Sequence, residues 1–146
     1  MEQIFSPALR SFNRVVDNVQ RLYHEMAQEA GIPDSCFHVL YTLYGTGSCR
    51  QKDICDVSGL PKQTIHSAVK QLIAGGAVTA EKAGGRDVLL SLTEAGWQLA
   101  RQTVEKTIRC ENAALAAMSE ADQTELIRLH EMFYHLLEQS YRQSKE

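Results

Sequence analysis

The chain has 146 residues, 44% of them hydrophobic and 23% charged, which is typical of one ordinary globular domain. Its formal net charge of −3 excludes the strong overall basic excess of proteins that coat nucleic acid. No stretch approaches the roughly 20 consecutive apolar residues that span a bilayer, and residues 1–10 lack a basic and apolar leader, so we expect a cytoplasmic protein without membrane contact.

The four cysteines are too few and too scattered for the disulfide framework of a small secreted protein, so we expect reduced thiols. A chain of this length can bury a sizeable core by itself, and we expect no cofactor. The sequence lacks the motifs of a serine hydrolase elbow, a phosphate-binding loop and a zinc protease helix. We therefore expect that the protein is not an enzyme.

Two helices are predicted at the start of the chain. Pro7 suits the first turn of a helix, and apolar residues then recur at steps of three and four as far as Ala30. Gly31 is expected to end this helix. Asp34 is expected to cap a second helix, which runs to Tyr44 before two glycines stop it.

A helix-turn-helix unit is predicted next. Gln51–Val57 forms a short amphipathic helix, and a Ser-Gly-Leu-Pro turn leads into a second helix that ends at Ala74. The apolar face of that second helix consists of Ile65, Ala68, Val69, Leu72 and Ile73. Polar residues lie on or beside the other face, namely Lys62, Gln63, His66, Ser67 and Lys70.

A β-hairpin follows this unit. Ala77–Lys82 and Asp87–Leu92 are rich in Val, Leu and Thr, which predicts two strands. Gly84 and Gly85 permit the positive φ angles of a tight turn between them. Residues 47–90 carry six Lys or Arg against four Asp or Glu, so this segment is basic in an otherwise acidic chain.

Two further helices complete the prediction. Thr93 is expected to cap a helix over residues 94–117, with acidic character in its first turn. Ser119 with Asp122 resembles a capping box, which predicts the start of a last helix. The apolar residues of this helix run from Leu126 to Leu137.

Three stretches of the middle segment together resemble the MarR family of winged-helix transcription regulators. They are QKDICDVSGLPKQTIHS over Gln51–Ser67, AGGAV over Ala74–Val78, and RDVLLSLTEAG over Arg86–Gly96. The order of the predicted elements is similar to this family along the whole chain, whereas the specific sequence signal lies within about residues 48–96.

The resemblance implies a mainly α fold with a small β-hairpin wing, in one domain over residues 1–146. A winged helix-turn-helix over residues 34–92 would bind DNA, and helices over residues 1–33 and 93–146 would form a homodimer. Wide apolar faces at both ends of the chain also favour a dimer, because a lone winged helix could not cover them. The implied function is that of a transcriptional repressor, which binds double-stranded DNA at a palindromic operator and responds to a small-molecule or oxidant signal.

The resemblance also indicates which residues would contact DNA. The helix that begins at Lys62 would be the recognition helix in the major groove. Gln63 could pair with adenine, and His66 can donate from one ring nitrogen while uncharged. The candidates for base contacts are Gln63, Thr64, His66 and Ser67, and those for phosphate contacts are Arg50, Lys52, Lys62 and Lys70.

The wing departs from the family pattern at one position. Arg86 corresponds to the wing arginine that reaches the minor groove in this family. The family usually has an acidic residue two positions before this arginine, whereas this chain has Gly84 there. Arg86 therefore lacks a carboxylate partner for a bidentate ion pair. Asp87 is adjacent in the strand and should point to the other face. We keep Arg86 as a candidate DNA contact.

Several modes of regulation stay open. An effector would lie between the dimer helices and the DNA-binding part, and the aromatic candidates are Phe12, Tyr23, Phe37, Tyr41 and Tyr44, with Trp97 beside them. Cys36 lies near the start of a predicted helix, where the helix dipole could lower its pKa, so it is the candidate oxidant sensor. We expect no metal site, because neighbouring Cys and His residues face apart; a site from distant segments, such as His24 with His38, stays open.

A protein-interaction module is the alternative function. The acidic overall charge and the altered wing are compatible with a winged helix that binds protein and has lost its affinity for DNA. A gel shift at two salt concentrations separates the two functions, because the interaction module would give no shift at low salt.

Overall fold

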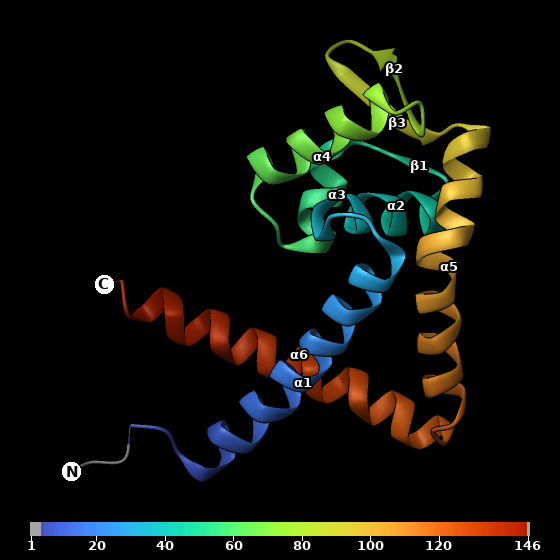
Figure 1. Cartoon of the computed structure of the whole chain (residues 1–146). Helices are drawn as coiled ribbons and strands as arrows, with labels where there is room; N and C mark the ends of the chain where they lie inside the picture. Colours follow the sequence, from blue (N-terminus) through green and yellow to red (C-terminus); the bar gives the residue numbers. More distant parts are fainter. Residues whose placement is uncertain (1–3, 146) are drawn as a thin grey trace. The chain divides into compact units, whose positions relative to one another are not determined.

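The computed structural model describes residues 4–145, which form six helices and a three-stranded sheet (Figure 1). The mainly α fold with a small β wing is therefore confirmed. The chain divides into two compact units, Met1–Ile108 and Arg109–Glu146. The helices and strands are α1 (Pro7–Ala30), α2 (Asp34–Thr46), β1 (Ser48–Cys49), α3 (Gln51–Ser58), α4 (Lys62–Ala74), β2 (Val78–Gly84), β3 (Asp87–Leu92), α5 (Glu94–Ala116) and α6 (Glu120–Gln143).

The first two helices begin and end close to their predicted boundaries, but α2 continues through Gly45, which was expected to stop it, and ends before Gly47. Ser6 caps α1, because its hydroxyl oxygen accepts from the backbone N–H of Leu9 at 3.1 Å, and Gly31 ends the helix with a φ of 71°. The predicted cap at Asp34 is wrong, since Asp34 is the first residue of α2 and follows Pro33, which makes no side-chain cap. The Asp34 carboxylate instead accepts from His24 Nδ1 at 2.9 Å and links α1 to α2.

The sheet contains one strand that the sequence pattern did not reveal. β3 is the central strand, flanked by β1 and β2, and both pairs are antiparallel. β1 has only two residues, Ser48 and Cys49, which pair with Ser91 and Leu90. Two residues are too few to show the alternation that identifies a strand in a sequence.

The hairpin of β2 and β3 forms the wing. Val78 pairs with Leu92 and Lys82 with Val88, and the register shifts between Lys82 and Gly84. Gly84 and Gly85 have φ angles of 115° and 59°, so the expected role of the two glycines in the turn is confirmed. The wing exposes most of its β2 side chains, and only Val78 is buried there.

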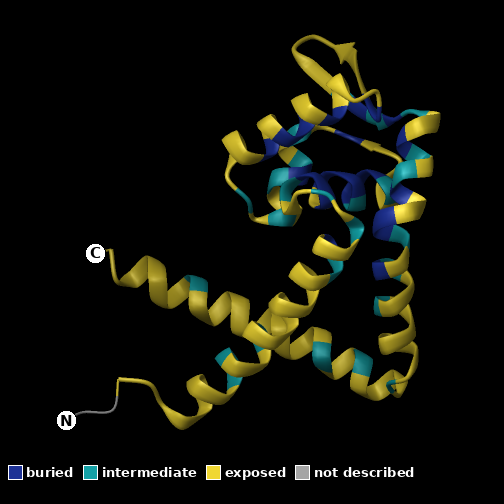
Figure 2. Ribbon diagram, in the orientation of Figure 1, coloured by how far each residue is buried: buried dark blue, intermediate teal, exposed yellow. Residues whose placement is uncertain are grey.

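The core of the first unit lies where α2, α3, α4 and the sheet meet. Leu40, Leu43, Ile54 and Ile65 are completely buried, and they come from three successive helices. Figure 2 shows this buried centre in dark blue beneath α4 and the strands. The predicted helix-turn-helix is therefore held in place by apolar packing between its two helices and α2.

A close contact fixes the start of α5 against the beginning of the wing. Thr93 caps α5 as predicted, because its Oγ1 accepts from the N–H of Gly96 at 3.0 Å and donates to the carbonyl of Gly76 at 2.6 Å. A Cβ placed on Gly96 would overlap the carbonyl oxygen of Ala77 and would lie 2.9 Å from its carbonyl carbon. Only glycine allows this approach of helix and strand backbone.

The second unit contains the end of α5 and the whole of α6. Ser119 caps α6 as predicted, since its Oγ accepts from the N–H of Asp122 at 3.1 Å. None of the residues assigned to α6 is buried. A stripe of large apolar side chains is exposed along it, namely Leu129, Met132, Phe133, Leu136 and Leu137. None of the helices in the described part of the chain is both long and apolar enough to cross a lipid bilayer.

Candidate nucleic-acid interface

The two sides of α4 have opposite character. Ile65, Ala68 and Val69 are buried in the core, and Leu72 continues this buried side. Ile73, which the periodicity also places inward, is 40% exposed, so that prediction is wrong. Ile73 follows Leu72 by one residue, which turns it about 100° away from the packed side.

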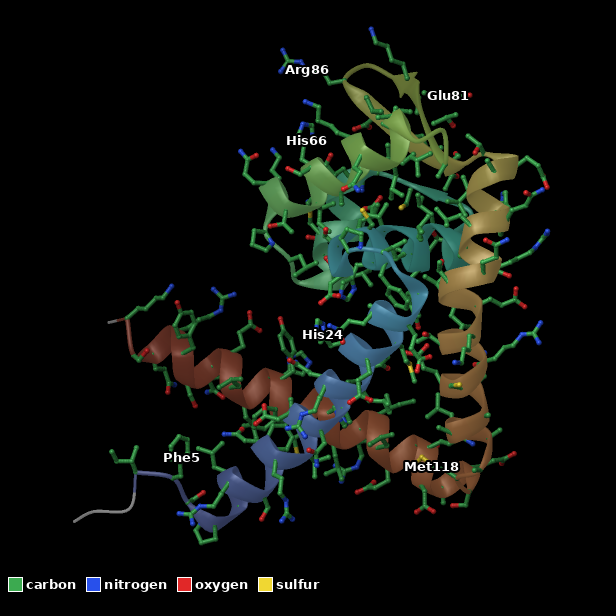
Figure 3. The ribbon with its side chains drawn as sticks, in the orientation of Figure 1. Phe5, His24, His66, Glu81, Arg86 and Met118 are labelled. Atoms are coloured by element: carbon green, nitrogen blue, oxygen red, sulfur yellow. The ribbon has the colours of Figure 1, made fainter. Side chains whose placement is uncertain are left out.

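The polar candidates on α4 face outward. The exposed residues of this side are Lys62, Gln63, Thr64, His66, Ser67 and Lys70. Figure 3 shows His66 projecting from α4, away from α2, and Arg86 projecting at the tip of the wing. The predicted outward orientation of this polar side is confirmed. A helix exposed in this way can present hydrogen-bonding side chains to a surface of matching shape.

His66 has a partner within the protein. Its Nδ1 lies 3.1 Å from Oε1 of Gln51, the first residue of α3, although the two are 15 positions apart in the sequence. The contact therefore joins the outer side of α4 to the start of the preceding helix. Sequence reasoning missed Gln51, because the pairing depends on how the two helices pack and no local spacing reveals it.

Arg50 also has a partner that the sequence reasoning missed. Its guanidinium forms a two-point ion pair with Asp53, at 2.9 and 3.2 Å, and the Asp53 carboxylate accepts from the Arg50 backbone N–H at 2.9 Å. These hydrogen bonds from Arg50 lower the pKa of Asp53 below its ordinary value. The signal was present, because a carboxylate three residues after the N-cap position typically bonds back to it.

The ion pair engages the guanidinium of Arg50, which is a candidate for phosphate contacts. Both side chains are partly exposed, at 48% and 37%, so separating them costs little. Asp53 raises the pKa of Arg50 by hydrogen bonding and by its charge, and Asp87 adds to this effect. Lys52, another candidate for phosphate contacts near the start of α3, is also exposed.

The wing arginine lies apart from the polar side of α4 in sequence but points to the same side of the first unit. Arg86 follows the turn glycines Gly84 and Gly85, and its side chain is exposed. Figure 3 shows Arg86 and His66 on one side of the hairpin and Glu81 on the other. A positive side chain at the tip of a thin hairpin is free to enter a narrow groove.

The five aromatic candidates for an effector site divide into two groups. Phe37, Tyr41 and Tyr44 lie on α2, where Phe37 is buried and its ring stacks on Tyr41 with centroids 6.4 Å apart. The Tyr44 hydroxyl donates to Glu105 Oε2 at 3.0 Å. Phe12 and Tyr23 lie on α1.

Two surface grooves lie elsewhere. One, of about 310 Å³, is lined by α1 residues that include Arg10, Arg14 and Arg21, with Phe5 preceding the helix. The other, of about 690 Å³, is lined by α6 residues that include Tyr134 and Tyr141. None of the five aromatic candidates lines either groove.

The candidate oxidant sensor is in an unfavourable environment for a thiolate. Cys36 is 2% exposed, and burial raises its pKa, so the expected lowering by the helix dipole is wrong. Its thiol donates a long hydrogen bond of 3.7 Å to Gln71 Oε1 on α4. Within residues 4–145, no group of three or more His, Cys, Asp or Glu side chains could hold a metal ion, and His24 pairs with Asp34.

Comparisons with known proteins also point to a winged helix-turn-helix. A sequence model of the MarR family matches residues 30–87. Nothing among the curated proteins matches the chain. A solved structure of a MarR family regulator from Neisseria meningitidis is similar, with a TM-score of 0.85 and 24% identity over 95% of this chain and 99% of that chain.

Two further solved structures share the fold. A MarR/EmrR family transcriptional regulator from Acinetobacter sp. ADP1 has a TM-score of 0.74 and 19% identity, over 92% of this chain and 99% of that chain. BpsR from Bordetella bronchiseptica, whose DNA binding is regulated by 6-hydroxynicotinic acid, has a TM-score of 0.60 and 19% identity, over 85% of this chain and 98% of that chain. The resemblance is thus confirmed as a similarity: residues 30–87 match the sequence model of the MarR family, and the chain has the fold of the solved MarR regulators.

Proposed function

We propose that this protein is a transcriptional regulator that binds double-stranded DNA through α4 and the wing. The observation that carries the proposal is the polar side of α4, whose candidate residues are all exposed while the opposite side is packed in the core. The major groove of B-DNA is about 12 Å wide and admits one α-helix. Arg86 projects on the same side of the unit, which supports a contact of its side chain with the adjacent minor groove.

The polar residues of α4 divide by chemistry into two roles. Lys62 and Lys70 carry charge without directional specificity, so they serve phosphate binding. Gln63 can form two hydrogen bonds to adenine, and Thr64 and Ser67 can donate or accept. Segment 47–90 has a charge balance of only +2, so one copy of it gives weak electrostatic attraction.

A homodimer compensates for this weak attraction by presenting two copies of α4 to one DNA duplex. The support lies in the apolar side chains that α1 and α6 expose, such as Val15 at 57% on α1 and Leu136 at 55% on α6. Monomeric proteins rarely leave rows of large apolar side chains exposed to water. The two symmetric copies of α4 bind half-sites about one helical turn apart, ~34 to 36 Å, which requires a palindromic operator.

The proposed regulator acts as a repressor that a small molecule releases. BpsR offers support, since its DNA binding is regulated by 6-hydroxynicotinic acid, an aromatic acid. An effector changes DNA affinity only if it binds one spacing of the two α4 helices more tightly than another. Phe12, Tyr23, Phe37, Tyr41 and Tyr44 are the residues proposed to meet it. Oxidant sensing at Cys36 is the less supported route, because the thiol is buried.

A gel shift with the DNA upstream of the protein's own gene tests the function. We expect a shift that weakens steeply between low and moderate salt, because phosphate contacts release counterions. Lys62→Ala should weaken it, whereas Arg101→Ala, which removes an exposed charge from α5, should not. No shift at low salt would contradict the proposal and favour the protein-interaction module.

A further inference from the structure

His66 and Gln51 form a contact whose chemistry is directional. Gln51 begins α3 and is half-buried, whereas His66 is exposed on α4. The contact joins His66 Nδ1 to the amide oxygen of Gln51 at 3.1 Å, within normal hydrogen-bond distance. It ties the ring of a candidate base-reading residue to the neighbouring helix.

The amide oxygen decides which ring nitrogen carries the proton. A glutamine Oε1 can only accept, so His66 Nδ1 must donate. A neutral imidazole has one proton, and the other nitrogen, Nε2, then carries a lone pair and accepts. The N–H that the sequence offered for DNA is therefore used inside the protein, and His66 presents an acceptor outward.

We propose that Gln51 is a positioning residue that fixes the tautomer of His66, so that His66 Nε2 reads an exocyclic amino group in the major groove. This inference rests on the proposed function. Adenine N6 and cytosine N4 are the amino donors on that edge, whereas guanine and thymine present acceptors there. His66 would thus favour adenine or cytosine and disfavour guanine or thymine at its contact.

The tautomer can be measured without DNA by long-range ¹H–¹⁵N correlation spectra of the histidine rings, above the pH range in which imidazole titrates. We expect the Nδ1–H pattern for His66 in the wild type. Gln51→Met, which keeps the length but removes the acceptor, should allow the Nε2–H form to appear. Gln51→Glu keeps an acceptor oxygen and should preserve the Nδ1–H pattern.

The chain offers an internal control for these spectra. His130 on α6 places its Nδ1 2.8 Å from the backbone carbonyl of Leu126, which likewise requires an Nδ1–H. Its pattern should be unchanged in both Gln51 variants. An Nε2–H pattern for His66 in the wild type, with His130 as expected, would overturn the proposed tautomer and leave the DNA-binding function standing.

The readout on DNA uses duplexes selected by the wild-type protein from a random library. The position that loses its preference with His66→Ala identifies the base pair that His66 reads. Replacing the adenine or cytosine there by its analogue without the amino group should weaken wild-type binding about two- to tenfold, the value of one hydrogen bond. The same analogue should not affect His66→Ala.

The Gln51 variants complete this test. Gln51→Met should relax the preference at the same base pair, and Gln51→Glu should restore it. A wild-type loss on the 7-deaza analogue of the purine in that base pair, with none on the amino-free analogues, would show that His66 donates, and would overturn the inference. Failure to select any duplex would overturn both the inference and the proposed function, whatever tautomer the spectra show.

Discussion

The DNA contacts proposed for single side chains on α4 are of two kinds, which experiments can separate. Lys62 is an exposed charge at the first residue of the helix, and Gln63 follows it with a bidentate amide. Lys62→Ala should weaken binding to all DNA sequences similarly and reduce the salt slope by about one, because it removes one phosphate contact. Gln63→Ala should instead cost about 1–3 kcal/mol of discrimination at one base pair. Fluorescence anisotropy on specific and random duplexes measures both, and equal losses on the two duplexes for Gln63→Ala would refute its reading role.

Asp53 shows the effect of one residue on the stability of the helix that supports α4. Hydrogen bonds from Arg50 hold the pKa of Asp53 below its ordinary value of 3.8. A carboxyl group with a lowered pKa stabilises the fold above its unfolded-state pKa, and this contribution is lost as the pH falls through its folded-state pKa. Asp53→Asn should lower Tm at neutral pH and narrow the difference in Tm between neutral pH and pH values below 3.8.

Thermal melts of Asp17→Asn provide the control for Asp53. Asp17 lies on α1 and is exposed. If both variants depend on pH in the same way, the Arg50 pairing does not stabilise α3. The pairing itself was open to prediction from the spacing of Arg50 and Asp53, but the contribution of Asp87 to the raised pKa of Arg50 was not, because Asp87 lies on β3, distant in the sequence.

Among the helices and strands, the contact between α5 and the start of β2 is the most sensitive to side-chain size. A Cβ on Gly96 would overlap the Ala77 carbonyl, and neither backbone can yield without disturbing the wing. Gly96→Ala should destabilise the fold by about 1–3 kcal/mol, as for an overpacked core. Gly45→Ala in α2 is the matched control, because nothing lies within 4 Å of its Cβ position. That variant should stabilise by about 0.5–1 kcal/mol, since Ala favours helix over Gly.

Denaturant unfolding measures the stability of both glycine variants, and an unchanged stability of Gly96→Ala would contradict the close contact.

Helix boundaries were predictable in this chain because capping residues such as Ser119 and stop residues such as Gly31 act locally. The two-residue strand β1 was not, since it forms by pairing with Ser91 and Leu90, which are distant in the sequence.

For the whole molecule, the exposed apolar stripe of α6 makes self-association testable. Leu136 is 55% exposed in one chain, so replacing it should not disturb the fold of that chain. Leu136→Glu should convert the proposed dimer to a monomer in sedimentation velocity, because two buried carboxylates would face an apolar interface. The DNA affinity of this variant should also fall, since a monomer makes only half of the contacts of the dimer.

Gln139→Glu is the charge-matched control on the same helix, at an exposed polar position. It should leave both the dimer and DNA binding unchanged. A Leu136→Glu variant that sediments as the wild type does would contradict the proposed use of α6 as an interface.

The sequence alone determined the succession of helices and the wing, because apolar periodicity, caps and glycine turns are local properties of the chain. It also indicated which side of α4 is polar, since one face of a helix follows from a spacing of three and four residues. The tertiary structure decided which polar groups remain available. Packing brings Gln51 Oε1 within 3.1 Å of His66 Nδ1, and burial raises the pKa of Cys36. For His66 and Cys36 the deciding contacts come from residues brought close by packing, which no local pattern encodes.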